Sequence, residues 1–280
     1  MTGRDSFETA LTPGRWTREL PVAIEAARAG GEILQEHSRR GVTMRNKGGG
    51  VSYDLVSDAD VDSEREIVRL IREAFPDDEI IGEEGQAGDS AAPRLWIIDP
   101  LDGTNNYAHN VPHYAVSIGF YESGSAAAGV VYQPTTDTVY TATRGGGAWI
   151  GKPDGSRVRA RCGGESSLSE VLIGCGFYYD RGEVMRRTLA SIETLFGRDI
   201  HGIRRMGTAS LDLVMVGLGL YGGFFEYELS AWDFAAGALF VTEAGGVMSD
   251  TEGEVLPIAK SSVLAAAPGI HSDLLAVVRL

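Results

Sequence analysis

Two kinds of periodicity divide the chain into a helical beginning and a strand-rich middle. Apolar residues spaced by three and four predict amphipathic helices over residues 21–37 and 59–75. From residue 79 the period changes, and short apolar runs between Gly, Pro and Asp turns predict strands over residues 79–82, 95–99, 115–121, 127–132 and 138–143. The short links between these strands imply hairpins, and hence a largely antiparallel or mixed sheet.

The last part of the chain alternates between the two patterns. Strands are predicted near Val171 and Phe224, and helices over residues 184–196, 210–220 and 232–244. Residues 1–15 form a polar tail, and the sequence shows no internal repeat and no linker. We therefore expect residues 1–280 to form a single α/β domain with layered helices and sheets.

Composition limits the partners of the protein. The formal net charge is -14, which disfavours nucleic acid and anionic membranes, and would repel a phosphorylated substrate unless divalent cations reverse the local charge. The two cysteines, Cys162 and Cys175, predict neither a disulfide framework nor a zinc site. With no signal peptide or membrane-spanning run in this sequence, we expect a cytoplasmic protein.

The first chemical signal is an apolar run that ends in two carboxylates, Asp99 and Asp102. A buried charge costs several kcal/mol unless it is paired or bound to a metal, so a purely structural explanation is poor. The turn at residues 103–105 follows directly and offers backbone N–H groups, which are a common way to hold a phosphate. Carboxylates beside an anion cradle predict metal-assisted phosphoryl chemistry.

Three more segments place acids where apolar residues are expected. Glu83 and Glu84 end a short strand, residues 54–60 carry acids into a helix start, and Asp233 lies in an otherwise apolar helix opening. Carboxylate oxygens are hard ligands that suit Mg²⁺ or Mn²⁺. Two or three such ions can activate a water and neutralise a leaving alkoxide.

Each acid also has a structural alternative. Asp60 and Asp233 have the spacing of capping boxes with Ser57 and Ser230, and either could serve only to cap its helix. Glu84 precedes a glycine and is typical of a solvated turn residue. Taken singly, these positions do not decide between a cap and a ligand.

Taken together, the four acidic segments resemble the inositol monophosphatase family. Residues 96–105 are similar to the first signature of that family and residues 226–237 to the second, while 82–84 and 54–60 agree in residue type, order and spacing. The resemblance runs from about residue 21 to the end of the chain. It implies an α/β (α+β) fold, a layered αβαβα sandwich of the inositol monophosphatase and fructose-1,6-bisphosphatase type with mixed and antiparallel sheets, and a homodimer.

The resemblance also implies a metal set. The implied ligands are Glu83, Asp99, the backbone carbonyl of Leu101, Asp102 and Asp233. Glu83, Asp99 and Leu101 would hold the first ion, Asp99, Asp102 and Asp233 the second, and Glu83 a third, weaker ion. The cofactor would be two to three Mg²⁺ ions, with Mn²⁺ as a substitute and Li⁺ as an inhibitor.

The remaining roles are likewise carried over from the family. The catalytic residues would be Glu83, Thr104 and Asp60, with Asp60 behind Thr104 so that the pair orients the attacking water. The substrate-binding residues would be Gly103, Thr104, Ala209, Glu226 and Asp233. Glu226 also stands at the end of a short apolar run, residues 222–225, which predicts a charge at a strand terminus.

The implied activity is a Mg²⁺-dependent phosphomonoesterase in which a metal-activated water attacks phosphorus in line, without a phosphoenzyme. Inositol 1-phosphate or a similar polyol or sugar phosphate is the leading substrate. Histidinol phosphate, fructose 1,6-bisphosphate and 3′-phosphoadenosine nucleotides remain alternatives, although the sequence reveals no aromatic or basic clamp for a nucleotide base. Arg204 and Arg205 are interpreted as surface residues, and His109 and His113 as structural ones. Lys47, followed by three glycines, departs from the family pattern.

Two rival readings come from other classes. A haloacid-dehalogenase-type phosphatase requires acids two residues apart, whereas Asp99 and Asp102 are three apart, so this reading is poor. A regulatory or binding protein on the same scaffold remains an alternative, because a fold does not fix a function.

Overall fold

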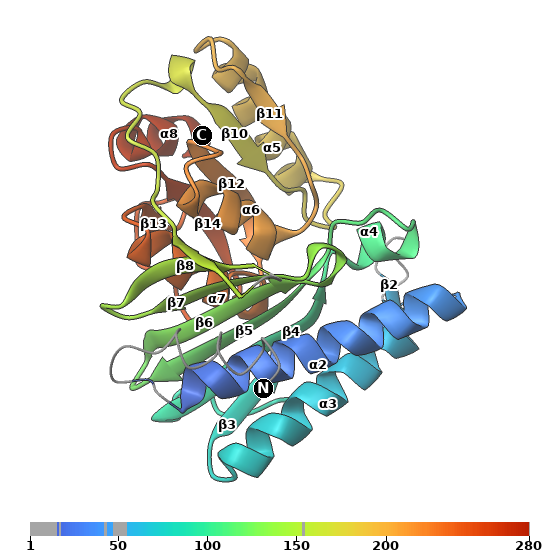
Figure 1. The fold of residues 1–280 in the computed structure, drawn as a ribbon. Helices are drawn as coiled ribbons and strands as arrows, with labels where there is room; N and C mark the ends of the chain where they lie inside the picture. Colours follow the sequence, from blue (N-terminus) through green and yellow to red (C-terminus); the bar gives the residue numbers. More distant parts are fainter. Residues whose placement is uncertain (1–15, 17, 42–43, 47–54, 153–154, 280) are drawn as a thin grey trace.

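The computed structural model describes residues 16, 18–41, 44–46, 55–152 and 155–279. Five layers follow one another (Figure 1). Helices α2 (Glu19–Arg40) and α3 (Asp58–Ala74) cover the outer face of a seven-stranded sheet, and α6 (Ala209–Gly217) and α7 (Ala231–Glu243) lie between it and a five-stranded sheet. Helices α5 (Glu183–Phe196) and α8 (His271–Val278) cover the far face of that second sheet. The predicted layered αβαβα sandwich is confirmed.

The seven-stranded sheet is built from consecutive strands. Their order is β3 (Glu79–Gly82), β4 (Arg94–Asp102), β5 (Ala115–Glu122), β6 (Ser125–Gln133), β7 (Thr138–Thr143), β8 (Gly147–Gly151) and β9 (Arg157–Arg159). Only the β3–β4 pair is parallel, and every later pair is antiparallel. This arrangement matches the hairpins expected from the short links.

The five-stranded sheet is mixed. Its order is β11 (Gly202–Arg204), β10 (Leu172–Cys175), β12 (Gly223–Leu229), β14 (Ser261–Ala266) and β13 (Val247–Ser249). The strand β10 is parallel to both neighbours, and β14 is antiparallel to both of its own. The described residues also include a short pair β1 (Met44–Asn46) and β2 (Leu55–Ser57), a helix α4 (Thr104–Ala108) and two 3₁₀ turns at Pro134–Thr136 and Leu168–Glu170.

Burial of apolar side chains holds these layers together. Leu20 and Ile24 of α2 are almost fully buried in a cluster with Trp96 and Phe120 of the first sheet, whose ring centroids lie 4.8 Å apart. Burying one such side chain contributes about 1.5–3 kcal/mol. The helices α6 and α7 are buried on almost every side because a sheet covers each of their two broad faces. A rigid frame therefore stands on both sides of the cleft between the sheets.

The predicted elements agree with the structure in most places. The strands at 79–82 and 138–143 have the predicted bounds, and the helix predicted over 59–75 is observed one residue earlier, as Asp58–Ala74. One prediction about Glu226 was wrong: it lies inside β12 because the strand continues to Leu229, where its pairing with β14 is irregular. The predicted tail at 1–15, Lys47 and residues 48–54 lie outside the described residues.

Some elements were missed. They are β1, β2, β8, β9, β11, β13, β14, α4, α8 and the two 3₁₀ turns. In the part of the chain that the structure describes, no helix is both long and apolar enough to cross a membrane.

Candidate active site

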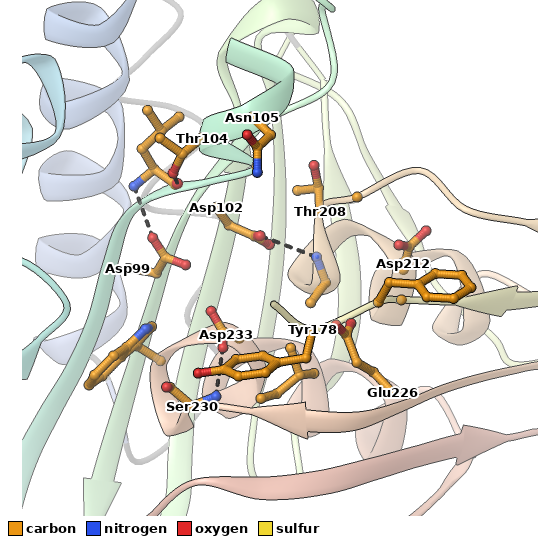
Figure 2. A pocket seen from close by; sticks show the side chains of 18 of the residues that line it. Asp99, Asp102, Thr104, Asn105, Tyr178, Thr208, Asp212, Glu226, Ser230 and Asp233 are labelled. Atoms are coloured by element: carbon orange, nitrogen blue, oxygen red, sulfur yellow. Dashed lines mark hydrogen bonds between the residues drawn. The ribbon is translucent and has the colours of Figure 1, made fainter. Parts of the chain in front are cut away.

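The candidate site is a cavity of about 310 Å³ between the two sheets. Figure 2 shows acidic side chains from β4, α7, α6 and β12 facing it from opposite sides. The lining residues include every predicted metal ligand and substrate-binding residue: Glu83, Asp99, Leu101, Asp102, Gly103, Thr104, Ala209, Glu226 and Asp233. Segments more than a hundred residues apart in the sequence therefore meet in one place.

The end of β4 brings the first two acids together. The regular pairing of β4 with β5 breaks between Asp99 and Asp102, and a Leu101 backbone N–H donates to Asp99 Oδ1 at 3.0 Å (Figure 2). The parallel partner β3 ends at Gly82, opposite Ile98, so Glu83 follows β3 just where Asp99 follows in β4. The sequence thus folds two strand ends into one acidic edge.

Asp99 is the most deeply buried of these acids, with 1% of its surface exposed. Burial raises its pKa well above the usual value, and the nearby charges of Glu83, Asp102 and Asp233 raise it further. Among the described residues no Lys, Arg or His side chain forms an ion pair with Asp99. Several carboxylates that are buried close together favour the binding of a positively charged ion.

Gly103 sets the turn after the two aspartates. Its φ of 94° lies in the left-handed region, and a Cβ there would lie 2.5 Å from Thr208 Oγ1, so a side chain would not fit. The turn starts α4, whose first residue, Thr104, donates its hydroxyl to the Leu101 carbonyl at 3.1 Å. Residues 103–105 all line the cavity, as an anion cradle requires.

Asp102 has a second task that the sequence did not reveal. Its carboxylate accepts hydrogen bonds from the Ala209 N–H at 3.2 Å and from the Ser210 N–H at 2.6 Å, and also from the Ser210 hydroxyl (Figure 2). It therefore caps the N-terminus of α6 across the cavity. Burial raises the pKa of Asp102 to about 6, and the Ser210 hydrogen bonds oppose that rise. A substrate hydroxyl at Ala209 would share this N–H with Asp102.

The resemblance implies that Asp60 acts behind Thr104, and the structure shows that it also has a local role at the start of α3. Its carboxylate accepts from the N–H and the hydroxyl of Ser57, at 2.9 and 2.6 Å, which completes the capping box of α3. Burial raises its pKa to about 6. It does not line the cavity, and no hydrogen bond joins it to Thr104 within the described residues. Asp60 therefore serves as a helix cap, which is one of the two roles that the sequence left open.

Asp233 also forms a capping box, but unlike Asp60 it lines the cavity. Its carboxylate accepts from the Ser230 N–H at 2.7 Å, which is the capping-box contact at the start of α7, and the residue also lines the cavity (Figure 2). A cap and a ligand position coincide here, so the two readings of the sequence do not exclude each other.

A buried glutamate, Glu64, supports the Glu83 turn and was missed by sequence reasoning. It is 4% exposed, and its Oε2 accepts from the Glu84 N–H at 2.9 Å. Glu84 does not line the cavity. The helical spacing of Glu64 on the buried face of α3 could have identified it.

The wall formed by the second sheet carries residues that the sequence did not assign to the site. Phe177, Tyr178 and Tyr179 follow β10 and line the cavity, and the two tyrosine rings lie edge to face with centroids 5.3 Å apart. Arg205 lines it too, although it is exposed, whereas Arg204 donates to its neighbour Ile203. Arg205 is thus both exposed, as predicted, and part of the cavity lining, which was not predicted. Aromatic side chains also line the cavity, although the sequence revealed no aromatic clamp.

The chemistry of the donors fits a hard divalent cation. Six carboxylates line the cavity, and among the described residues that line it Arg205 is the only Lys, Arg or His. Oxygen ligands and uncompensated negative charge are what Mg²⁺ requires. In the described part of the chain, no three acidic, Cys or His side chains already converge on one point in a ligating arrangement.

Comparisons with known proteins identify the family of the chain. Residues 16–279 match the inositol monophosphatase family. An inositol-1-monophosphatase of Rhizobium meliloti is 42% identical over 75% of this chain and 77% of its own length. The Nus factor SuhB of Pseudomonas aeruginosa is 39% identical over 88% of this chain and 90% of its own. The solved structure of an IMPase from Thermotoga maritima has a TM-score of 0.81 at 32% identity and covers 91% of this chain and 94% of its own.

Proposed function

Because the chain belongs to the inositol monophosphatase family, we propose that it is a Mg²⁺-dependent phosphomonoesterase that hydrolyses a polyol or sugar phosphate, with inositol 1-phosphate as the leading substrate. One observation carries this proposal. Six carboxylates and the turn at residues 103–105 line the same cavity, which joins a divalent-cation environment to an anion cradle.

The side of the cavity nearest β4 would hold the metal. Glu83, Asp99, the Leu101 carbonyl, Asp102 and Asp233 would be the ligands, as the family resemblance implies. Bound Mg²⁺ would supply Lewis-acid chemistry at the phosphate and at the departing oxygen. Such fixed charges account for most of the rate enhancement in sites of this kind.

The protein's own groups would place the ester. The backbone N–H groups of Gly103 and Thr104 would bind phosphate oxygens, since backbone donors at a turn suit an anion. Thr104 directs its hydroxyl at Leu101, close to the implied ligand shell, and would orient the attacking water. Asp60 would act behind Thr104 in orienting that water, as the family resemblance implies, and it also caps the start of α3.

The test is phosphate release from a panel of esters with and without Mg²⁺. Inositol 1-phosphate, a sugar phosphate, histidinol phosphate, fructose 1,6-bisphosphate and a 3′-phosphoadenosine nucleotide would form the panel. We expect Mg²⁺-dependent release that is fastest for the polyol monophosphates and is inhibited by Li⁺. Release from none of them would refute the proposal.

A role in transcription is the second candidate. It is favoured by the similarity to Nus factor SuhB, which extends over most of both chains. A variant without phosphatase activity, Asp99→Asn, separates the two: a transcription role would persist in that variant, whereas a role that depends on catalysis would be lost.

A further inference from the structure

Asp212 is a buried carboxylate in the cavity wall for which the proposed metal and phosphate sites have no use. It lies on α6 with 1% of its surface exposed, between Leu211 and Leu213, which are fully buried. The residue lines the cavity, and Figure 2 shows it on the same side as Glu226, across from Asp99.

The two oxygens of Asp212 have different environments. The Thr208 backbone N–H donates a hydrogen bond to the carboxylate. Oδ1 is buried and has no hydrogen-bond partner among the described residues. A buried acceptor without a donor costs about 1–3 kcal/mol, so a ligand that supplies the donor recovers that free energy.

The charges around Asp212 define what that ligand can be. The charge of Asp102 acts on it from the opposite wall. Glu226, which is 7% exposed, and Arg205 are its charged neighbours on its own wall, and all three residues line the cavity. Two carboxylates against one guanidinium leave this end of the cavity negative. It therefore favours neutral hydroxyl donors and repels a second phosphate.

From this geometry we infer that Asp212 is a specificity-determining residue that accepts a hydrogen bond from a hydroxyl of the leaving alcohol, remote from the ester bond. The inference rests on the proposed function and narrows it. The substrate is then a monophosphate of a polyhydroxy alcohol, and bisphosphates are poor substrates even though Arg205 is close.

The experiment compares two substrates in Asp212→Ala. The kcat/KM ratio of inositol 1-phosphate to p-nitrophenyl phosphate, which has no hydroxyl on its leaving group, should fall about 10- to 100-fold, the range for losing a hydrogen bond to a charged group. Most of the change should appear in KM. The ratio of fructose 1,6-bisphosphate to inositol 1-phosphate should rise, because a repelling charge is gone.

Two variants control this measurement. Asp77→Ala removes an exposed aspartate outside the cavity and should leave all the ratios unchanged. Asp212→Asn keeps the shape and one acceptor oxygen but no charge, so it should lose less on inositol 1-phosphate, and it carries the test where Asp212→Ala does not fold.

The possible outcomes separate the role of Asp212 from the proposed function. Unchanged ratios, or an equal loss on both monoesters in a variant with the wild-type melting temperature, would overturn the inference while leaving the phosphatase proposal intact. A wild-type protein that hydrolyses no ester would refute the proposed function itself. In that case the affinity of wild type and Asp212→Ala for inositol 1-phosphate, measured by calorimetry, tests Asp212 separately, and equal affinities would overturn its role.

Discussion

The two walls of the cavity are built on different principles. The wall at the ends of β3 and β4 is a set of carboxylates on strand ends and short turns, and backbone N–H groups hold two of them: Leu101 donates to Asp99, and Ala209 and Ser210 donate to Asp102. The opposite wall combines aromatic rings from the loop after β10, Arg205 from the loop after β11, and two acids, Asp212 of α6 and Glu226 of β12. Carboxylates that are fixed by backbone hydrogen bonds stay in place when nearby side chains change, which suits a catalytic step shared by different substrates. A wall assembled from many elements can change one residue at a time, and we expect it to set the choice of substrate.

The largest effect should come from breaking the first wall at Asp99. Asp99→Asn keeps the size of the side chain but removes the charge, and we expect kcat to fall by at least about 100-fold, as for the loss of one preorganised charge in an active site. Phosphate release at saturating Mg²⁺ measures it. Asp77→Asn, at an exposed position, is the matched control. Activity within a few-fold of wild type would remove Asp99 from the ligand set.

The same variant should gain stability when metal is absent. Burial and three neighbouring acids raise the pKa of Asp99, which means that its charge destabilises the folded state. In EDTA, Asp99→Asn should therefore melt several degrees above wild type. Mg²⁺ at about 100 times its Kd should raise the wild-type melting temperature by roughly 5–10 °C, and the variant by less. Calorimetry in both buffers gives the comparison, and equal Mg²⁺ shifts in the two proteins would contradict it.

A smaller and more selective effect is expected from the second wall. A Cβ on Gly176 would lie 1.7 Å from Glu226 Oε2, so Gly176→Ala must displace that carboxylate. We expect KM for inositol 1-phosphate to rise about 10-fold while kcat changes little. Gly164→Ala is the matched control, because nothing lies within 4 Å of its added Cβ. A loss confined to kcat would place Glu226 with the chemistry instead.

The smallest effect should come from His113, behind the cavity. Its Nε2 is buried and unpaired among the described residues, and burial lowers its pKa. The folded state thus favours the neutral ring, so His113 supports stability above its unfolded pKa of about 6.5 and loses that support as the pH falls. Unfolding midpoints between pH 8 and 5 should fall more steeply in wild type than in His113→Gln. Parallel pH profiles would show that the ring has the same pKa in the folded and unfolded states and would contradict this prediction.

The sequence predicted the first wall better than the second, for physical reasons. Asp99 and Asp102 interrupt a long apolar run, and an acid at the end of a buried strand stands out. Asp212 interrupts the apolar run at 211–216 in the same way, so the sequence does mark this acid. The prediction for residues 210–220 was a helix and included no functional residue. Arg205 and Tyr178 belong to loops without periodicity, and only the tertiary fold brings them to the cavity.

The fold shows the same division. Strands that pair with their sequence neighbours, such as β7, were predicted with their bounds. The strand β14 pairs with the preceding strand β13 and with β12, from which α7 and β13 separate it in the sequence, and its small residues give no alternating pattern. The helix α4 has five residues, too few for a helical period, and begins where Gly103 adopts a positive φ.

The helix cap that Asp102 provides for α6 couples the evolution of the two walls. Any substitution that moves this carboxylate alters the charge near β4 and, at the same time, frees the first turn of the helix that carries Ala209 and Asp212. Within the described residues, no hydrogen bond or ion pair joins the side chains at positions 178, 205 and 212 to Asp99, so a substitution at one of them leaves the acids at the end of β4 in place. A change at position 102 would have to be accompanied by a new cap at residue 210.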